Sequence, residues 1–341
     1  MNLDGIHHIT AITGDAPRNV DFYTQVLGLR MTAKTVNQDD PSVYHLFYGD
    51  ENAQPGADLT FFEYPGAIPG RAGAGMVHRI VWRVASREAI AYWATRLGDD
   101  GVATERDGGA LLFADPEGLA HELVVDDSGD EPLSAEHPEI PAAFALRGFE
   151  GVRAYSFRPD DSALVLERLM GAVRRGEDGE PGGSGAGDRH GTGNSDGAGA
   201  GSATFDLRGE RRGGWIAWDP APAERARQSA GTVHHIAWAT TDADMQSWID
   251  AVTAAGIPNS GYVDRHYFHS LYFREPGGVL YELATREPGF TVDGPVEELG
   301  TKLLLPPFLE PRRAQIAARL TPLPDPRADR VAGAAAAPTR S

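Results

Sequence analysis

Two pairs of adjacent histidines, His7-His8 and His234-His235, stand out among the residues of this 341-residue chain that could do chemistry. Each pair opens a short run of β-branched and apolar residues, which indicates a β-strand. Because neighbouring side chains of a strand point to opposite faces, one histidine of each pair can point into a given cavity. Two equivalent strands would then present two imidazoles to one shared site.

A carboxylate late in the chain completes this pattern. Glu282 lies in the otherwise apolar run Val279–Leu283. A carboxylate in the middle of such a strand needs a partner, and a divalent cation is a strong one. The chain has no cysteine, which excludes disulfides and thiolate ligands. Two histidines and one carboxylate with open positions form the facial triad of non-haem iron(II) oxygenases, so the sequence predicts a metal site of this type.

Similar helices follow the two histidine strands. Apolar residues at helical spacing predict helices over Pro17–Leu27 and Asp244–Ala255, which end at Gly28 and Gly256. Each glycine follows its histidine pair at nearly the same distance along the chain. The two segments therefore indicate an internal repeat.

The repeat extends to the strands after each helix. Strand, Pro/Gly turn and strand follow one another over residues 267–284 and again over 110–125. Weaker copies of the pattern complete four βαβββ units, near residues 5–66, 75–127, 147–220 and 231–286. This predicts an α+β fold.

The second and third units lack the histidine pairs. Glu122 ends the second unit where Glu282 ends the fourth, but the first strand of the second unit carries Arg79 at the place of His235, and that of the third unit carries Ala154. Without histidines beside it, we interpret Glu122 as a structural carboxylate.

The segments between the units predict the domain organisation. Residues 128–146 are acidic and contain prolines, and we expect them to link an N-terminal domain of two units, 1–127, to a C-terminal domain of two units, 147–310. The glycine-rich, polar stretch 176–201 is predicted to be a flexible loop inside the third unit. Residues 311–341 form a C-terminal extension that we expect to be partly disordered.

The composition excludes two classes of partner. Acidic residues outnumber basic ones by 49 to 31, for a net charge of −18, and such a surface repels a nucleic-acid backbone. The N-terminus lacks the basic and apolar regions of a signal peptide, and no apolar run approaches the roughly 18–20 residues that span a bilayer. We therefore expect a cytoplasmic protein that binds neither nucleic acid nor membrane.

Several motifs resemble the vicinal oxygen chelate superfamily, which includes glyoxalases, bleomycin resistance proteins and extradiol dioxygenases. They are Gly5-Ile-His-His-Ile-Thr10, the segment from Gly14 to Tyr23 and Val26-Leu-Gly-Leu29. Motifs similar to the hydroquinone and catechol dioxygenase branch are Lys34-Thr-Val-Asn37, Tyr44-His-Leu46, Arg274-Glu-Pro-Gly-Gly-Val-Leu-Tyr-Glu282 and Leu305-Pro-Pro-Phe-Leu-Glu-Pro311. Apart from the glycine-rich stretch, the resemblance covers about residues 1–320.

The resemblance implies how the units pair and which residues bind the metal. Four βαβββ units would form two open-barrel sheets, with the catalytic cavity in the sheet made by units one and four. The ligands would be His8, His235 and Glu282, that is, the second histidine of each pair and the carboxylate. The metal would be iron(II), with manganese(II) as the alternative.

The resemblance also implies residues that act beside the metal. His7 and Thr10 would lie next to the first ligand, and Arg265 and Tyr272 would contact the substrate. Arg265 could hold a phenolate because a guanidinium is a permanent donor and charge. Tyr272 could donate a hydrogen bond to substrate or oxygen. His266 and His269 are further candidates for acid–base work, whereas we interpret His45 as structural.

The implied activity is ring cleavage of a hydroquinone or catechol by an iron(II) enzyme of the extradiol type that inserts both atoms of O2. The partners would be a small aromatic substrate, O2 and a second copy of the chain in a homo-oligomer. Three alternatives share the scaffold: a glyoxalase-type isomerase, which a fourth ligand at Glu63 would favour, a thiol transferase that binds manganese(II), and a metal-free ligand-binding protein.

Overall fold

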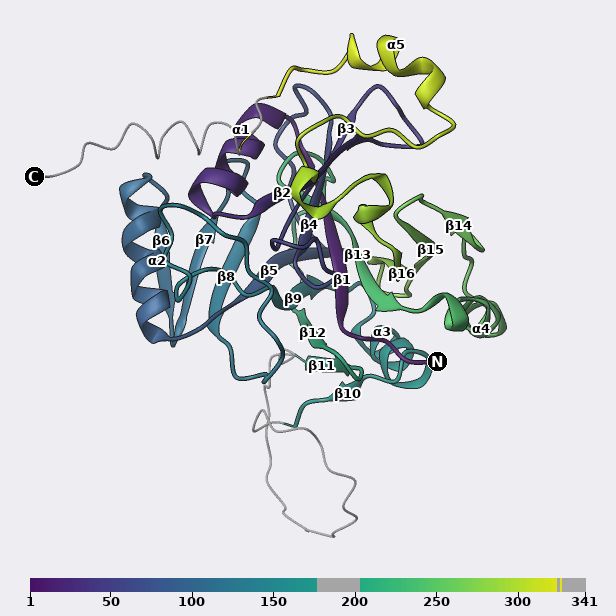
Figure 1. The fold of residues 1–341 in the computed structure, drawn as a ribbon. Coiled ribbons are helices and arrows are strands. Elements are labelled where there is room, and N and C mark those ends of the chain that lie inside the picture. The colour runs from purple at the N-terminus through teal and green to yellow at the C-terminus, as the bar shows by residue number, and fades with distance from the viewer. Residues whose placement is uncertain (177–202, 324–325, 327–341) are drawn as a thin grey trace, which may run out of the picture.

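The computed structural model describes residues 1–176, 203–323 and 326. In these residues the strands form two eight-stranded sheets (Figure 1). The order of the first sheet is β14-β15-β16-β13-β1-β4-β3-β2, and that of the second is β10-β11-β12-β9-β5-β8-β7-β6. The predicted α+β fold of four βαβββ units in two curled sheets is confirmed.

The first sheet joins the first and fourth units. Its strands are β1 (Ile6–Thr13), β2 (Arg30–Val36), β3 (Tyr44–Gly49), β4 (Asp58–Glu63), β13 (Thr232–Thr240), β14 (Val263–Asp264), β15 (Phe268–Arg274) and β16 (Leu280–Pro288). At its centre β1 and β13 run antiparallel, and each has a parallel neighbour on its other side, β4 and β16 respectively. The two histidine pairs therefore lie on adjacent strands.

The second sheet repeats this plan with the second and third units. Its strands are β5 (Met76–Val84), β6 (Thr104–Asp107), β7 (Ala110–Ala114), β8 (Ala120–Val125), β9 (Phe149–Tyr155), β10 (Val173–Arg174), β11 (Ala203–Arg208) and β12 (Gly213–Asp219). The central pair is β5 and β9, with β8 and β12 as their parallel neighbours. Each sheet thus combines a unit from residues 1–127 with one from 147–310.

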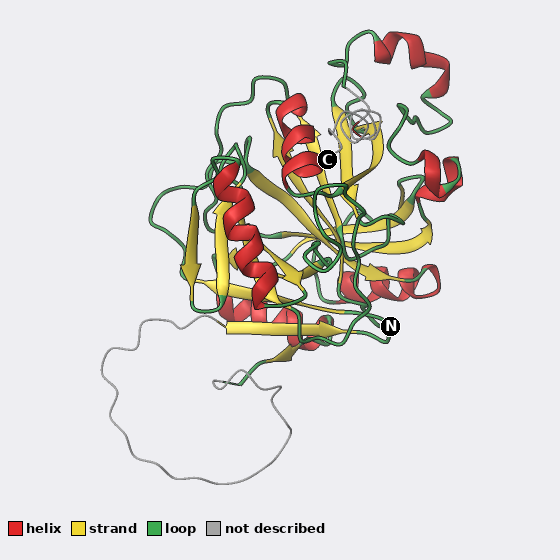
Figure 2. Cartoon of the chain, turned by 60° about the vertical axis from the view of Figure 1, so that its left-hand side comes forward, coloured by secondary structure: helices red, strands yellow, loops and turns green. Residues whose placement is uncertain are grey.

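The helices lie outside the curved strands (Figure 2). They are α1 (Ala16–Asp21), which continues into the π-helical turn η1 (Phe22–Val26), α2 (Arg87–Asp99), α3 (Pro159–Leu164), which continues into η2 (Val165–Leu169), and α4 (Asp242–Ala254). Short helices follow the last strand: η3 (Phe290–Asp293), η4 (Val296–Glu298), η5 (Glu310–Arg312) and α5 (Arg313–Ala317). No helix of the described residues is long and apolar enough to cross a membrane.

The two predicted helices near the histidine strands are present, with one difference. Asp15 accepts a hydrogen bond from the Arg18 amide at the start of α1, and Gly28 takes a φ of 72°, as a residue just after a helix often does. The predicted helix over Pro17–Leu27 is present, and its second half, η1, takes the π form and buries Phe22, Tyr23 and Thr24 in succession.

A continuous hydrophobic core connects the two sheets. It contains fully buried residues of both, among them Ile9 and Trp238 of the first and Trp82 and Phe149 of the second. The predicted loop 176–201 lies outside the described residues apart from Gly176, as does most of the extension beyond residue 323. The core holds the central strands, and with them the histidine pairs, in fixed positions.

Candidate metal centre

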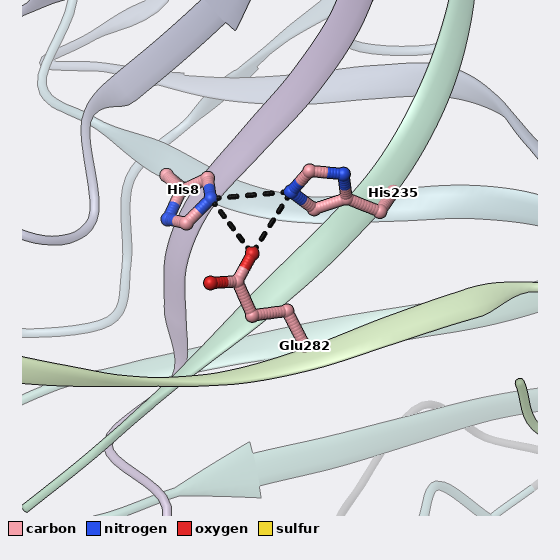
Figure 3. A group of neighbouring side chains, drawn as sticks. All are labelled: His8, His235 and Glu282. Atoms are coloured by element: carbon pink, nitrogen blue, oxygen red, sulfur yellow. Dashed lines mark hydrogen bonds and ion pairs between the residues drawn. The ribbon is translucent and has the colours of Figure 1, made fainter. Parts of the chain in front are cut away.

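Three predicted ligand residues meet on the first sheet. His8 of β1, His235 of β13 and Glu282 of β16 point toward one another (Figure 3). The Oε2 atom of Glu282 lies 3.1 Å from Nε2 of His8 and 2.9 Å from Nε2 of His235, and the two Nε2 atoms lie 3.3 Å apart. All three residues are buried. Such a group could hold a metal ion.

The strand register explains why the second histidine of each pair points inward. His8 lies opposite Ala237 on β13, and Glu282 lies beside Ala237 from the other neighbour, β16. His235 is two residues before Ala237 and therefore projects from the same face of its strand. Three adjacent strands thus bring three side chains to one point.

A chain of hydrogen bonds orients the His8 ring. Nδ1 of His8 lies 2.9 Å from Nδ1 of His7, and Nε2 of His7 lies 3.0 Å from the Thr285 carbonyl oxygen. Because a carbonyl only accepts, Nε2 of His7 must carry a proton. Burial and the neighbouring His8 lower the pKa of His7 to about 3, so the ring is neutral and its Nδ1 accepts from His8. His8 thus donates from Nδ1 and presents its Nε2 atom to Glu282 and His235.

The second pair has a similar contact. Nδ1 of His235 lies 2.8 Å from Nδ1 of His234. Burial lowers the pKa of both rings, that of His234 to about 3, so both are neutral at physiological pH. Neutral imidazole is the form of histidine that binds metals.

Glu282 supplies a buried negative charge. Its Oε1 atom accepts a hydrogen bond of 2.5 Å from Ser270 Oγ, whereas Oε2 makes no well-oriented hydrogen bond. Burial alone would raise the pKa of Glu282, but His8 and His235 lower it well below its usual value, so the group is a carboxylate. A buried anionic oxygen beside two imidazole nitrogens fits a divalent cation of the His-His-carboxylate type.

A cavity of about 270 Å³ lies beside this group, and Arg265 and Tyr272 are among the residues that line it. Arg265 Nε donates to Tyr272 Oη at 3.3 Å, and its Nη2 atom lies 3.1 Å from Asp39 Oδ2. The Tyr272 ring centroid is 5.8 Å from that of His235. Burial and Glu282 raise the pKa of Tyr272, which keeps its phenol protonated. The structure therefore brings both residues to the site.

Other predicted residues lie elsewhere. His7 and Thr10 are buried beneath the site and do not line the cavity. His266 is paired with Asp293 at 2.9 Å and His269 with Asp242 at 2.6 Å, and neither ring reaches the cavity.

The position for a fourth ligand is taken by a threonine. Glu282 lies beside Ala237, which is two positions after His235. The residue two positions after His8 is Thr10, and it lies beside Thr60 on β4. Glu63 lies further along β4 and accepts from the Ala16 amide at 3.2 Å. The structure does not bring Glu63 to the three ligand candidates.

The strand pairing corrects one of our residue assignments in the second sheet. Val81 corresponds to Ala237, since Glu122 lies beside it on β8 and Gly151 lies opposite it on β9. The counterpart of His8 is therefore Gly151, and the prediction of Ala154 is wrong. Gly148 accepts a hydrogen bond from the Arg83 amide as Gly5 accepts one from the Ala239 amide, so Gly148 takes the place of Gly5 and Gly151 that of His8. Arg79, two residues before Val81, takes the place of His235 as predicted.

Sequence reasoning missed two residues that shape the site. His45 lines the cavity, although we interpreted it as structural, and Ser270 holds the ligand carboxylate. Alternation along the strands could have indicated both, since Ser270 is two residues before Tyr272, and His45 is two residues before Phe47, which also lines the cavity.

Comparison with known proteins identifies the family. The family model described as "Glyoxalase/Bleomycin resistance protein/Dioxygenase superfamily" matches residues 5–123 and 185–283. The chain belongs to this superfamily. The "Putative ring-cleaving dioxygenase MhqA" of Bacillus subtilis (strain 168) is 38% identical to it over 330 residues, which cover 95% of this chain and 100% of the relative.

Two further relatives are themselves named as dioxygenases. The "Chlorohydroquinone/hydroquinone 1,2-dioxygenase" of Sphingobium indicum is 31% identical over 322 residues, or 90% of this chain and 93% of the relative. The crystal structure of a "putative dioxygenase" from Bacillus subtilis superposes with a TM-score of 0.83 at 37% identity, covering 95% of this chain and 98% of that one. The resemblance inferred from the sequence motifs is confirmed at the level of the family.

Proposed function

We propose that the chain is an iron(II)-dependent dioxygenase that cleaves the ring of a hydroquinone- or catechol-type aromatic, with His8, His235 and Glu282 as the metal ligands. The observation that carries the proposal is the buried group of two imidazoles and one carboxylate beside a cavity lined by aromatic side chains. The ring-cleaving dioxygenases among its relatives support the reaction class.

The side chains around the site fit an anionic phenol. When bound, iron(II) would supply an electron source for O2 and a common binding point for both reactants. Arg265 offers a fixed positive charge for a phenolate, and Tyr272 donates a hydrogen bond to an oxygen held beside His235. Phe47, Phe62 and Phe268 line the cavity and exclude water from the reacting ring.

The ligand number favours an oxygenase over a glyoxalase-type isomerase. Thr60 stands where the first unit would supply a fourth ligand. Its hydroxyl is hydrogen-bonded to Thr10 at 2.8 Å, away from the three candidate ligands. A three-residue set leaves positions open for both substrate and O2. We propose that the ring opens beside a hydroxyl-bearing carbon, which is cleavage of the extradiol type.

The test is metal analysis and oxygen uptake with protein purified without air. We expect about one iron per chain and consumption of one O2 per hydroquinone or catechol cleaved, with both oxygen atoms found in the product by ¹⁸O₂ mass spectrometry. Protein reloaded with manganese(II) tests the alternative metal. Stoichiometric zinc or nickel, with no oxygen uptake on either substrate, would overturn the proposal.

A further inference from the structure

His45 lies on the wall of the cavity that faces Arg265 and Tyr272. In the first sheet the ligand strands β16, β13 and β1 lie between β15, which carries Tyr272, and β4 and β3, which carry Phe62 and His45. The side chains of both walls line the same cavity. A ligand held at the centre therefore has Arg265 and Tyr272 on one side and His45 on the other.

The His45 ring is held in a fixed orientation. Its centroid lies 4.1 Å from that of Phe47 and 4.3 Å from that of Phe62. Its Nε2 atom is 2.9 Å from Thr60 Oγ1, which is itself 2.8 Å from Thr10 Oγ1. The threonine at the place of a fourth ligand thus anchors a histidine of the cavity wall.

The other ring nitrogen is available to a ligand. Among the described residues Nδ1 of His45 has no hydrogen-bond partner, and the residue is only partly buried within the cavity lining. Burial of the ring lowers the pKa of His45 well below its ordinary value, so the imidazole is neutral. Because a threonine hydroxyl can donate or accept, Nδ1 can take either role toward a hydroxyl group.

We propose that His45 binds the ring hydroxyl that lies para to the substrate oxygen held at the metal site, and so selects 1,4-dihydroxylated rings. This inference rests on the proposed function, because it places one substrate oxygen at His8, His235 and Glu282. The backbones of β1 and β3 are two strand spacings apart, or about 10 Å. A flat ring with oxygens at opposite ends spans from the ligands toward His45, whereas both oxygens of a catechol lie at the metal end.

Anaerobic calorimetry with iron-loaded protein tests this role. Hydroquinone and phenol differ only in the para hydroxyl, and we expect the wild-type protein to bind hydroquinone about tenfold more tightly, the effect of one hydrogen bond in a closed cavity. In His45→Phe, which keeps a planar ring, the preference should vanish while the affinity for phenol stays unchanged. A hydroquinone preference that persists in His45→Phe would overturn the proposal.

Two further variants make the test independent of how His45→Phe folds. Thr60→Val removes the hydroxyl that anchors His45. The preference for hydroquinone over phenol should fall in this variant, but by less than in His45→Phe. An unchanged preference would count against the proposal. His78→Phe removes a histidine of the second sheet and should leave both affinities as in the wild type.

Metal content and oxygen uptake of the same preparations separate the two proposals. Oxygen uptake on hydroquinone, together with an unchanged preference in His45→Phe, overturns the role of His45 and leaves the dioxygenase standing. A preference that depends on His45 in a protein that consumes no oxygen supports the role of His45 and overturns the dioxygenase.

Discussion

The two sheets share one arrangement of central strands but differ at the positions of the candidate ligands. The second sheet keeps the carboxylate, as Glu122, and replaces the two ligand histidines by Arg79 and Gly151. Arg79 Nη1 lies 3.1 Å from Glu122 Oε2. A guanidinium thus provides the positive charge that a metal would provide in the first sheet.

The space left by the missing histidine is also filled. Trp215 on β12 lies beside Gly151, and its indole nitrogen donates to Glu150 at 3.0 Å. A Cβ atom on Gly151 would come within 2.2 Å of the Trp215 ring. The repeated unit therefore keeps its fold and its charge balance in the second sheet without any open ligand position. The proposed metal binding therefore depends on a few side chains and not on the architecture.

The largest effect on iron affinity and oxygen uptake should come from replacing the carboxylate of the first sheet by an amide. Glu282→Gln removes the only anionic ligand, and we expect iron affinity and oxygen uptake to fall by about a thousandfold or more, beyond the 10–100-fold typical of residues behind the ligands. Glu122→Gln is the matched control and should leave both at the wild-type level. Metal analysis with an oxygen electrode measures the two, and equal losses in both variants would contradict the contrast between the sheets.

The second prediction concerns the space beside Gly151 that the Trp215 ring fills. Gly151→Ala forces the Trp215 ring to move, and we expect the free energy of unfolding to fall by about 3 kcal/mol. Urea unfolding followed by tryptophan fluorescence measures it. In a Trp215→Ala background the same substitution should cost far less. If the cost is the same in both backgrounds, the indole does not occupy the place of the histidine.

Repetition in the sequence predicts the architecture but not every position within it. The four units, the pairing of His8 with His235 and the carboxylate of β16 follow from motifs that recur along the chain. The choice of Ala154 over Gly151 failed because Gly148 takes the place of Gly5, which only the hydrogen bonds to the neighbouring strand reveal. Register is a property of two strands together.

The function of side chains across the cavity is harder to predict. His45 sits in an ordinary alternating strand, and only the curvature of the sheet brings it to face Arg265. The π-turn at Phe22–Val26 is similar, since its Tyr23 side chain is hydrogen-bonded to Asp115 of the second unit, which is remote in the sequence. Such features depend on tertiary contacts that a single sequence does not reveal.

A third prediction concerns the histidine behind the first ligand. His7→Phe removes the acceptor for the Nδ1 proton of His8, and we expect iron affinity to fall by about 10–100-fold. Competition with a metal chelator measures this affinity. The control is His78→Phe, since His78 stacks on Tyr155 with centroids 3.9 Å apart and is remote from the ligands. Unchanged affinity in His7→Phe would show that the hydrogen-bond chain to Thr285 does not orient the ligand.

A second buried polar cluster shows how such groups are stabilised without a metal. Tyr23 Oη lies 3.0 Å from Asp115 Oδ2 and 3.1 Å from His121 Nε2, and Trp82 Nε1 donates to His121 Nδ1 at 3.1 Å. Burial lowers the pKa of His121 to about 3, so it is neutral and carries its proton on Nε2. Every donor then has an acceptor, whereas Oε2 of Glu282 in the candidate metal centre makes no well-oriented hydrogen bond.

The smallest predicted effect is the pH dependence of this cluster. Burial raises the pKa of Asp115 from 3.8 to about 6, so the folded protein binds this proton more tightly than the unfolded chain. Its contribution to stability is complete below about pH 4 and is lost as the pH rises through 6. Between pH 5 and pH 7 the free energy of unfolding should fall by about 1 kcal/mol more in the wild type than in Asp115→Asn. Urea unfolding at several pH values measures how the free energy of unfolding changes with pH in the wild type and in Asp115→Asn. His121 contributes equally to both proteins. Parallel curves would mean that Asp115 is ionised throughout, and that this cluster, like the metal site, contains a buried anion.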